Sequence, residues 1–226
     1  MVILGIDTSL GTAVAVIEDD GLVLAEASSP DPLGHAELIG DLLAAVLADA
    51  ALGPVGSTAP AAPVIPTHVA AGMGPGPFTG LRVGIAAARA FALGRGLPVV
   101  PVVSHDAIAL SILLDAAITE RPEAGFAVVT DARRREYAYS LYRGIDDDGL
   151  PIRIEGPALA PRDDIDALLA DRGFARRDAY GVSAAMIALV ASRALASGRV
   201  DTAAHEPLYL RAPDVTISRG PKRVTG

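Results

Sequence analysis

The stretch Val2-Ile3-Leu4-Gly5-Ile6-Asp7-Thr8-Ser9, residues 2–9, opens the chain with apolar residues and ends on three small polar ones. Such a short apolar run, bounded by polar residues, predicts a buried β-strand over 2–6. A second strand is predicted over 12–17, and the hairpin signal Asp19-Asp20-Gly21 leads into a third over 22–27. The start of the chain therefore predicts a three-stranded meander.

The same pattern begins again at residue 126. A strand over 126–130 ends at Asp131, a second follows over 136–143, and Asp147-Asp148-Gly149 precedes a third over 151–155. Helical periodicity and further apolar runs predict the other elements: helices over 35–49, 79–93, 105–118, 163–170 and 183–196, and strands over 68–72 and 98–103. A duplicated meander followed by α and β segments predicts two similar α/β lobes.

We place the lobes at residues 1–104 and 105–226. A linker rich in Pro, Gly and Ala spans 53–66 in the first lobe, and we expect the C-terminal lobe to be shortened after Leu169. A polar tail follows Pro213 and predicts a loosely ordered end. Two lobes with an aspartate at the end of each first strand resemble the actin/hexokinase/Hsp70-like ATPase (ribonuclease H-like) fold, in which two hairpins clamp nucleotide phosphates.

Asp7, Thr8 and Ser9 are therefore a candidate phosphate-binding hairpin. Their backbone N–H groups and hydroxyls have the chemistry to face an anion or hydrated Mg²⁺. An ordinary turn capped by the aspartate explains the same residues. The sequence leaves both interpretations open.

The segment Gly72-Met73-Gly74-Pro75-Gly76-Pro77-Phe78-Thr79-Gly80-Leu81-Arg82-Val83-Gly84 joins a predicted strand to a predicted helix. Its glycines permit close backbone approach and its prolines stiffen it, so we expect a shaped loop. A P-loop is excluded, because the motif is absent and Lys222 is the only lysine. Gly80, Gly84 and Ala88 recur every four residues, a groove suited either to a partner helix or to packing within the chain.

Composition narrows the function classes. The net charge of −8 argues against strong binding of nucleic acid by the chain alone. The absence of cysteine excludes disulfides and thiol catalysis, and no apolar run is long enough to span a bilayer, so we expect a cytoplasmic protein without membrane contact. The four histidines, His35, His68, His105 and His205, match no metal motif, and we predict no metal site.

The turn Asp131-Ala132-Arg133-Arg134-Arg135-Glu136-Tyr137 is densely charged. It suits contact with a partner, a substrate or a tRNA phosphate, and equally suits a solvated hairpin loop. No nucleophile elbow is present, so we predict no catalytic residue.

Several of these segments together resemble the TsaB (YeaZ) family of tRNA threonylcarbamoyladenosine biosynthesis proteins. They span nearly the whole chain in order: 6–9, 35–37, 74–84, 131–133, 136–138 and 206–211. The central loop is the most specific of them. TsaD members of this group carry a histidine metal motif after a strand like that at 98–103, whereas here Ala109 stands where the second ligand is expected.

The resemblance implies a non-catalytic subunit that pairs with TsaD, and with TsaE in a ternary complex. That complex transfers threonylcarbamoyl to the adenosine beside the anticodon of ANN-decoding tRNAs. ATP and metal are expected on the partner subunits, tRNA only through the complex, and a homodimer when the chain is alone. An ATP-binding or metallopeptidase-like enzyme of the same superfold is the alternative. We predict a partner interface on the helices over 35–49 and 79–93, formed by Leu38, Leu42, Phe78, Thr79, Leu81, Arg82, Gly84, Ile85 and Ala88.

Overall fold

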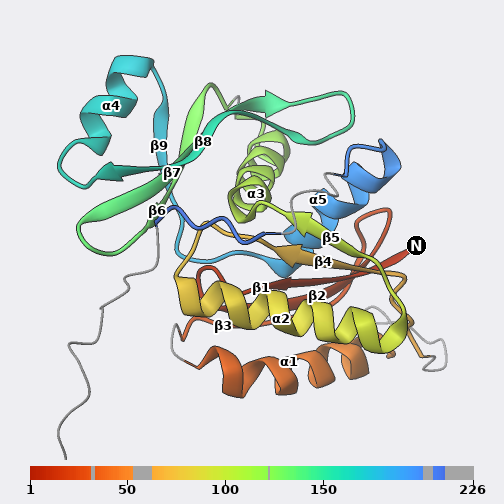
Figure 1. Ribbon diagram of the computed structural model, residues 1–226. Helices are drawn as coiled ribbons and strands as arrows, with labels where there is room; N and C mark the ends of the chain where they lie inside the picture. The colour runs from red at the N-terminus through yellow and green to blue at the C-terminus, as the bar shows by residue number, and fades with distance from the viewer. Residues whose placement is uncertain (32–33, 53–62, 122, 201–205, 212–226) are drawn as a thin grey trace, which may run out of the picture.

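The computed structural model describes residues 1–31, 34–52, 63–121, 123–200 and 206–211. Two β-sheets form the framework, with two helices between them and others on their outer faces (Figure 1). The predicted linker over 53–66 lies partly outside the described residues, and the tail after Pro213 lies wholly outside them. Within the described part, no helix is long and apolar enough to cross a membrane.

The first sheet has the strand order β3-β2-β1-β4-β5. Its strands are β1 (Val2–Asp7), β2 (Thr12–Glu18), β3 (Val23–Ser29), β4 (His68–Gly72) and β5 (Val99–Val102). β1, β2 and β3 pair antiparallel, whereas β4 and β5 continue parallel to β1. Leu4 and Ile6 pack into the core on one face, and Ile3 packs into the core on the other. Burial on both faces explains why β1 is a continuous apolar run.

Helices cover both faces of this sheet (Figure 1). α1 (His35–Ala50) and α2 (Phe78–Arg95) lie side by side on one face. α5 (Ala184–Ala196) lies on the other, with α3 (Ser104–Ile118) packed against it. A Cβ on Gly5 would lie 2.1 Å from the carbonyl oxygen of Ala184, so this glycine permits the close approach of α5 to β1.

The second sheet has the order β8-β7-β6-β9. It contains β6 (Phe126–Asp131), β7 (Glu136–Ile145), β8 (Pro151–Pro161) and β9 (Ala175–Asp178), and α4 (Ile165–Arg172) packs beside β9. β6 pairs antiparallel with β7 and parallel with β9, as β1 pairs with β2 and β4. This shared topology, with one strand fewer in the second sheet, confirms the predicted two-lobed fold.

Two elements differ from the sequence prediction. β8 runs through the Gly156-Pro157 pair, where the prediction ends the strand, because an irregular register against β7 takes up the extra residues. β9 was not predicted, because Arg176, Arg177 and Asp178 give it no apolar alternation. The side chains of this edge strand form ion pairs. Arg176 pairs with Asp166 and Asp178, and Arg177 pairs with Glu123.

The two sheets lie on either side of the predicted boundary between residues 104 and 105. The last helix is an exception: α5 follows the second sheet in the sequence but packs on the first sheet, where it contacts β1, β2 and β4. The first lobe thus contains residues from both ends of the chain.

Candidate functional site

The polar residues at the end of β1 are turned into the protein. The exposed fractions of Asp7, Thr8 and Ser9 are 1%, 0% and 1%. The Asp7 carboxylate accepts hydrogen bonds from the N–H and the hydroxyl of Ser9 at 2.8 and 2.6 Å, and from the Ser104 hydroxyl at 2.5 Å. Burial raises the pKa of the Asp7 carboxyl, and these bonds partly oppose the rise. The side chains that we expected to face an anion therefore engage atoms of this chain.

Thr8 fastens the start of α2 to the first sheet. Its hydroxyl donates to the carbonyl of Gly80 at 2.7 Å and accepts from the N–H of Gly84 at 3.1 Å. A Cβ on Gly84 would lie 2.2 Å from that same hydroxyl oxygen, so a larger residue does not fit here. Thr8 therefore packs against the small residues Gly80 and Gly84 of α2.

This arrangement corrects part of the predicted partner interface. Four of its nine residues, Leu81, Gly84, Ile85 and Ala88, are buried within the chain. The apolar three belong to the core cluster that β1 and β4 also supply. The remaining predicted residues reach the surface to different degrees: Leu38, Leu42 and Phe78 are half-buried, and Thr79 and Arg82 are exposed. The small-residue face of α2 therefore serves packing within the chain.

The glycine-rich loop after β4 is also held from within. A Cβ on Gly72 would lie 1.9 Å from a carboxylate oxygen of Asp7. Gly74 exchanges two hydrogen bonds with the first residue of α3: its N–H donates to the Ser104 hydroxyl at 3.1 Å, and its carbonyl accepts from the Ser104 N–H at 2.8 Å. The loop therefore lies where β1, β4, α2 and α3 meet.

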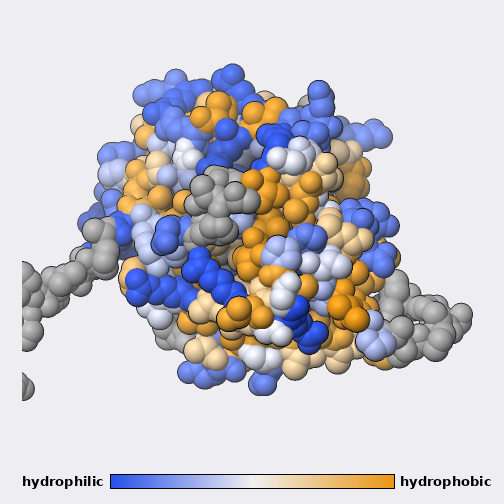
Figure 2. Space-filling model, turned by 45° about the vertical axis from the view of Figure 1, so that its right-hand side comes forward, coloured by the Kyte–Doolittle hydropathy of each residue, from blue (hydrophilic) through white to orange (hydrophobic). Residues whose placement is uncertain are grey.

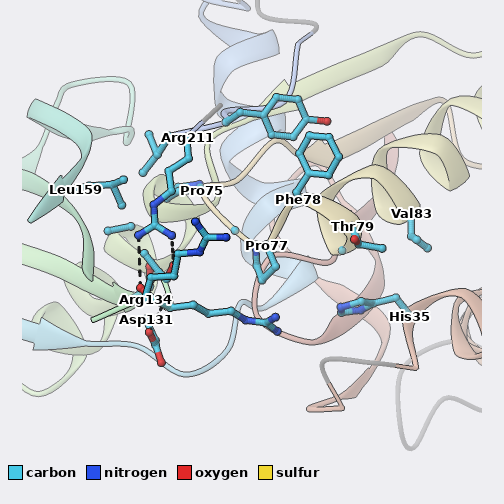
Figure 3. Close-up of a pocket in the computed structure, with 18 of the residues that line it drawn as sticks. His35, Pro75, Pro77, Phe78, Thr79, Val83, Asp131, Arg134, Leu159 and Arg211 are labelled. Carbon is cyan, nitrogen blue, oxygen red and sulfur yellow. Dashed lines mark hydrogen bonds between the residues drawn. The ribbon is translucent and has the colours of Figure 1, made fainter. Parts of the chain in front are cut away.

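A cleft of about 640 Å³ opens between the lobes, beside this loop. One wall comes from α1, α2 and the glycine-rich loop, and the other comes from β6, β7, β8 and the turn after β6. Figure 3 shows His35, Thr79 and Val83 on the first side and Asp131, Arg134 and Leu159 on the second. The volume lies in the range of small-ligand pockets.

Residues 206–211 form a strap across the top of the cleft. The Leu208 N–H donates to the Met73 carbonyl at 2.8 Å. The Tyr209 ring lies 4.7 Å from the Phe78 ring, and its hydroxyl accepts from Nε of Arg82 at 2.9 Å. The Arg82 guanidinium also stacks 3.7 Å from the centre of the Phe78 ring, in a favourable cation–π contact. The strap is thereby anchored to the first lobe.

The far end of the strap grips the second lobe through Arg211. Its guanidinium pairs with the Glu136 carboxylate. It also donates to the carbonyls of Ala132 and Arg133 at 3.3 and 3.4 Å (Figure 3). The strap therefore connects the lobes at the mouth of the cleft. In the sequence, 206–211 contributed only to the family resemblance, and no local signal indicated that these residues line the cleft.

Three consecutive arginines form the turn on the second-lobe side. Arg133, Arg134 and Arg135 have φ angles of 61°, 51° and 61°, a left-handed conformation uncommon outside glycine. Asp131 supports the turn by accepting from the Arg133 N–H and from the Arg162 guanidinium, each at 2.7 Å. Although its slight burial opposes the shift, the hydrogen bond from Arg162 holds the pKa of Asp131 below its usual value.

Of the four histidines predicted not to ligate metal, His205 lies outside the described residues and the other three lie in different places. His68 begins β4 and shares a hydrogen bond of 3.0 Å with the Thr67 hydroxyl. His35 begins α1 and shares a hydrogen bond of 2.8 Å with the Thr12 hydroxyl. His105 lies in the first turn of α3 and bonds the hydroxyls of Ser140 and Thr130 at 2.9 and 3.0 Å. Burial lowers the pKa of His105 to about 3. Among the described residues, no group of three or more metal-ligating side chains comes together.

Known proteins are similar to this chain in sequence and in fold. Residues 34–151 match the family model described as "TsaD: tRNA N6-adenosine threonylcarbamoyltransferase". Uncharacterized proteins of Mycobacterium tuberculosis and Mycobacterium bovis are 37% identical over 221 residues, covering 94% of this chain and 92% of each relative.

Two proteins of Pseudomonas aeruginosa with solved structures have a similar fold. YeaZ matches with a TM-score of 0.64 and 22% identity, over 92% of this chain and 99% of its own. A protein described as similar to peptidase YeaZ matches with a TM-score of 0.67 and 23% identity, over 93% and 99%. At 22–23% identity, this similarity shows a shared fold.

The topology defines a two-lobed protein of the actin-like type. At its first candidate phosphate hairpin, the side chains of Asp7, Thr8 and Ser9 form hydrogen bonds within the chain. The sequence match is more specific. The chain belongs to the threonylcarbamoyltransferase family that the matching model describes, and the predicted resemblance to its TsaB (YeaZ) members is confirmed.

Proposed function

We propose that this chain is a non-catalytic, cytoplasmic subunit that pairs with TsaD. In this proposal it supports the transfer of threonylcarbamoyl to the adenosine beside the anticodon of ANN-decoding tRNAs. TsaE joins the pair in a ternary complex, ATP and metal are held by the partner subunits, and tRNA is reached only through the complex. Family membership and the inward-facing Asp7, Thr8 and Ser9 support a partner role.

The outer face of α1 and α2 carries this proposal. Small or apolar side chains are exposed along both helices, at Ala44, Ala48, Ala86, Ala90 and Leu93. Leu93 is 85% exposed, and a Cβ on Gly40 would meet nothing within 4 Å. Over the wider surface, Figure 2 shows hydrophilic residues along the upper rim of the molecule and hydrophobic residues mixed with hydrophilic ones across the middle of the view. A face of small residues lets partner helices approach closely.

The test is capture of purified TsaD by the tagged chain. Ala44→Arg places a large charged side chain on the outer face without disturbing the core, so we expect capture to fall at least tenfold. Ala167→Arg, an equally exposed alanine on α4, is the matched control and keeps full capture. Equal capture by both variants refutes this interface. Circular dichroism confirms that both variants are folded.

The same variants address self-association. In the absence of TsaD, we expect a homodimer of wild type by sedimentation and a monomer of Ala44→Arg. Depletion of the chain in cells, followed by nucleoside analysis of tRNA, tests the pathway itself: an undiminished threonylcarbamoyladenosine content contradicts the proposed function. Micromolar binding of ATP·Mg²⁺ to the isolated chain, lost in Asp7→Ala, favours the enzymatic alternative.

A further inference from the structure

We propose that the Arg133–Arg134 turn binds phosphates of an RNA strand, with a nucleotide base lying in the cleft between this turn and the Phe78–Tyr209 pair. This inference rests on the proposed function, because the acidic chain needs a partner to hold RNA against its overall charge of −8. It goes further by assigning the contact to particular residues of this chain.

The backbone of the turn is the first argument. A hairpin that only needed to reverse direction would place glycine or asparagine in the left-handed region. Here Arg133, Arg134 and Arg135 occupy it in succession. Such conformations are strained and persist where neighbouring groups enforce them, often at functional sites. Asp131 and Arg211 enforce this one through hydrogen bonds to the backbone of the turn.

The accessibility of the cations is the second argument. Arg133 and Arg134 both line the cleft and both are exposed, so a ligand in the cleft can reach their guanidinium groups. Guanidinium groups bind phosphate oxygens in a bidentate manner.

The opposite wall is the third argument. Phe78 and Tyr209 line the same cleft, and both residues are half-buried. Arginines beside aromatic rings are the combination by which proteins hold single-stranded nucleic acid. A cleft of about 640 Å³ accommodates a nucleotide. RNA is favoured over free ATP, because the Thr8 hydroxyl and the N–H and hydroxyl of Ser9, the donors expected to bind its phosphates, donate to groups of this chain.

The first experiment measures tRNA binding by fluorescence anisotropy, using the complete chain in complex with TsaD at several salt concentrations. Each phosphate contact adds about 0.7–0.9 to the slope of log affinity against log salt. We expect Arg133→Ala/Arg134→Ala to make that slope shallower by about 1.4–1.8. The matched control is Arg121→Ala/Arg143→Ala, which removes two exposed arginines outside the cleft and leaves the slope unchanged. Equal slopes for the two double variants overturn the proposal.

A second variant separates binding from folding. Arg133→Gly/Arg134→Gly suits the left-handed backbone better than arginine, so its melting temperature should not fall. We expect it to lose tRNA affinity as the alanine variant does. Retained affinity, or binding of ATP that depends on these two arginines, overturns the assignment to RNA. If an acidic peptide binds the turn and tRNA does not displace it, the turn belongs to a protein partner. That result also overturns the assignment to RNA.

Crosslinking distinguishes this inference from the proposed function. Ultraviolet irradiation of cells that express the full chain should yield RNA attached to peptides that contain Phe78 or Tyr209. The absence of RNA on those peptides overturns this inference even where TsaD is captured normally. Failed capture of TsaD, with RNA still attached at the cleft, overturns the proposed function alone.

Discussion

The contact between Gly84 and Thr8 makes a quantitative prediction. In Gly84→Ala the new methyl group would lie 2.2 Å from the Thr8 hydroxyl oxygen and 2.9 Å from its methyl carbon. Thr8 has to move, which breaks its bonds to Gly80 and Gly84. Two buried hydrogen bonds contribute roughly 1 kcal/mol each, and overpacking costs about 1–3 kcal/mol. Alanine returns about 1 kcal/mol through its helix propensity.

We therefore expect Gly84→Ala to lower the free energy of unfolding by about 3 kcal/mol, and the melting temperature by roughly 6–12 °C. Urea unfolding followed by circular dichroism measures the change. Gly40→Ala is the matched control, because that glycine lies in α1 with open space around it. It should stabilise the protein by about 1 kcal/mol through propensity alone.

A double-mutant cycle identifies the cause. Thr8→Ala removes the hydroxyl oxygen and the methyl carbon that would crowd an alanine at position 84. In that background Gly84→Ala should therefore be markedly less destabilising. If Gly84→Ala is as stable as wild type, or equally harmful in both backgrounds, the assignment of this glycine to internal packing is refuted.

Two further predictions concern the interior and the strap. Burial lowers the pKa of His105 from 6.5 to about 3, so between these values the unfolded chain binds a proton that the folded chain does not, and stability falls as the pH drops. From pH 7 to pH 5 we expect the free energy of unfolding, measured with urea, to fall by about 2 kcal/mol in wild type but not in His105→Asn. The buried carboxyls with raised pKa, Asp7 and Asp106, affect both proteins alike. Tyr209→Ala removes a ring contact and the bond from Arg82, together about 2 kcal/mol, so exchange of the Leu208 amide should be roughly 30-fold faster by mass spectrometry. An unchanged exchange rate shows that the strap is held by other contacts.

The duplicated fold was predictable because its signals are local. Asp7 and Asp131 each end an apolar run, and a hairpin dipeptide follows each at a similar distance. Strand β9 escaped prediction because it is placed by pairing with β6 and by contacts with residues elsewhere in the sequence, such as the ion pair between Arg177 and Glu123.

The site was harder to predict because its contacts are distant in sequence. Periodicity located the small residues of α2 correctly and left two possible occupants for their groove. The choice depends on Thr8, 76 residues from Gly84. Likewise, residues 7–9 have the sequence of a phosphate hairpin, but the Asp7 carboxylate accepts hydrogen bonds from Ser9 and from Ser104, which lies 97 residues away.

The position of α5 has a consequence for synthesis on the ribosome. The strands of the first sheet are complete once β5 has emerged at residue 102, yet one face of that sheet awaits a helix that begins at Ala184. At about 5–20 residues per second, this face stays uncovered for several seconds. Ile3, Ile17 and Val100 point into that face. The nascent chain is then a natural client for a chaperone that shields apolar strands until the last helix arrives.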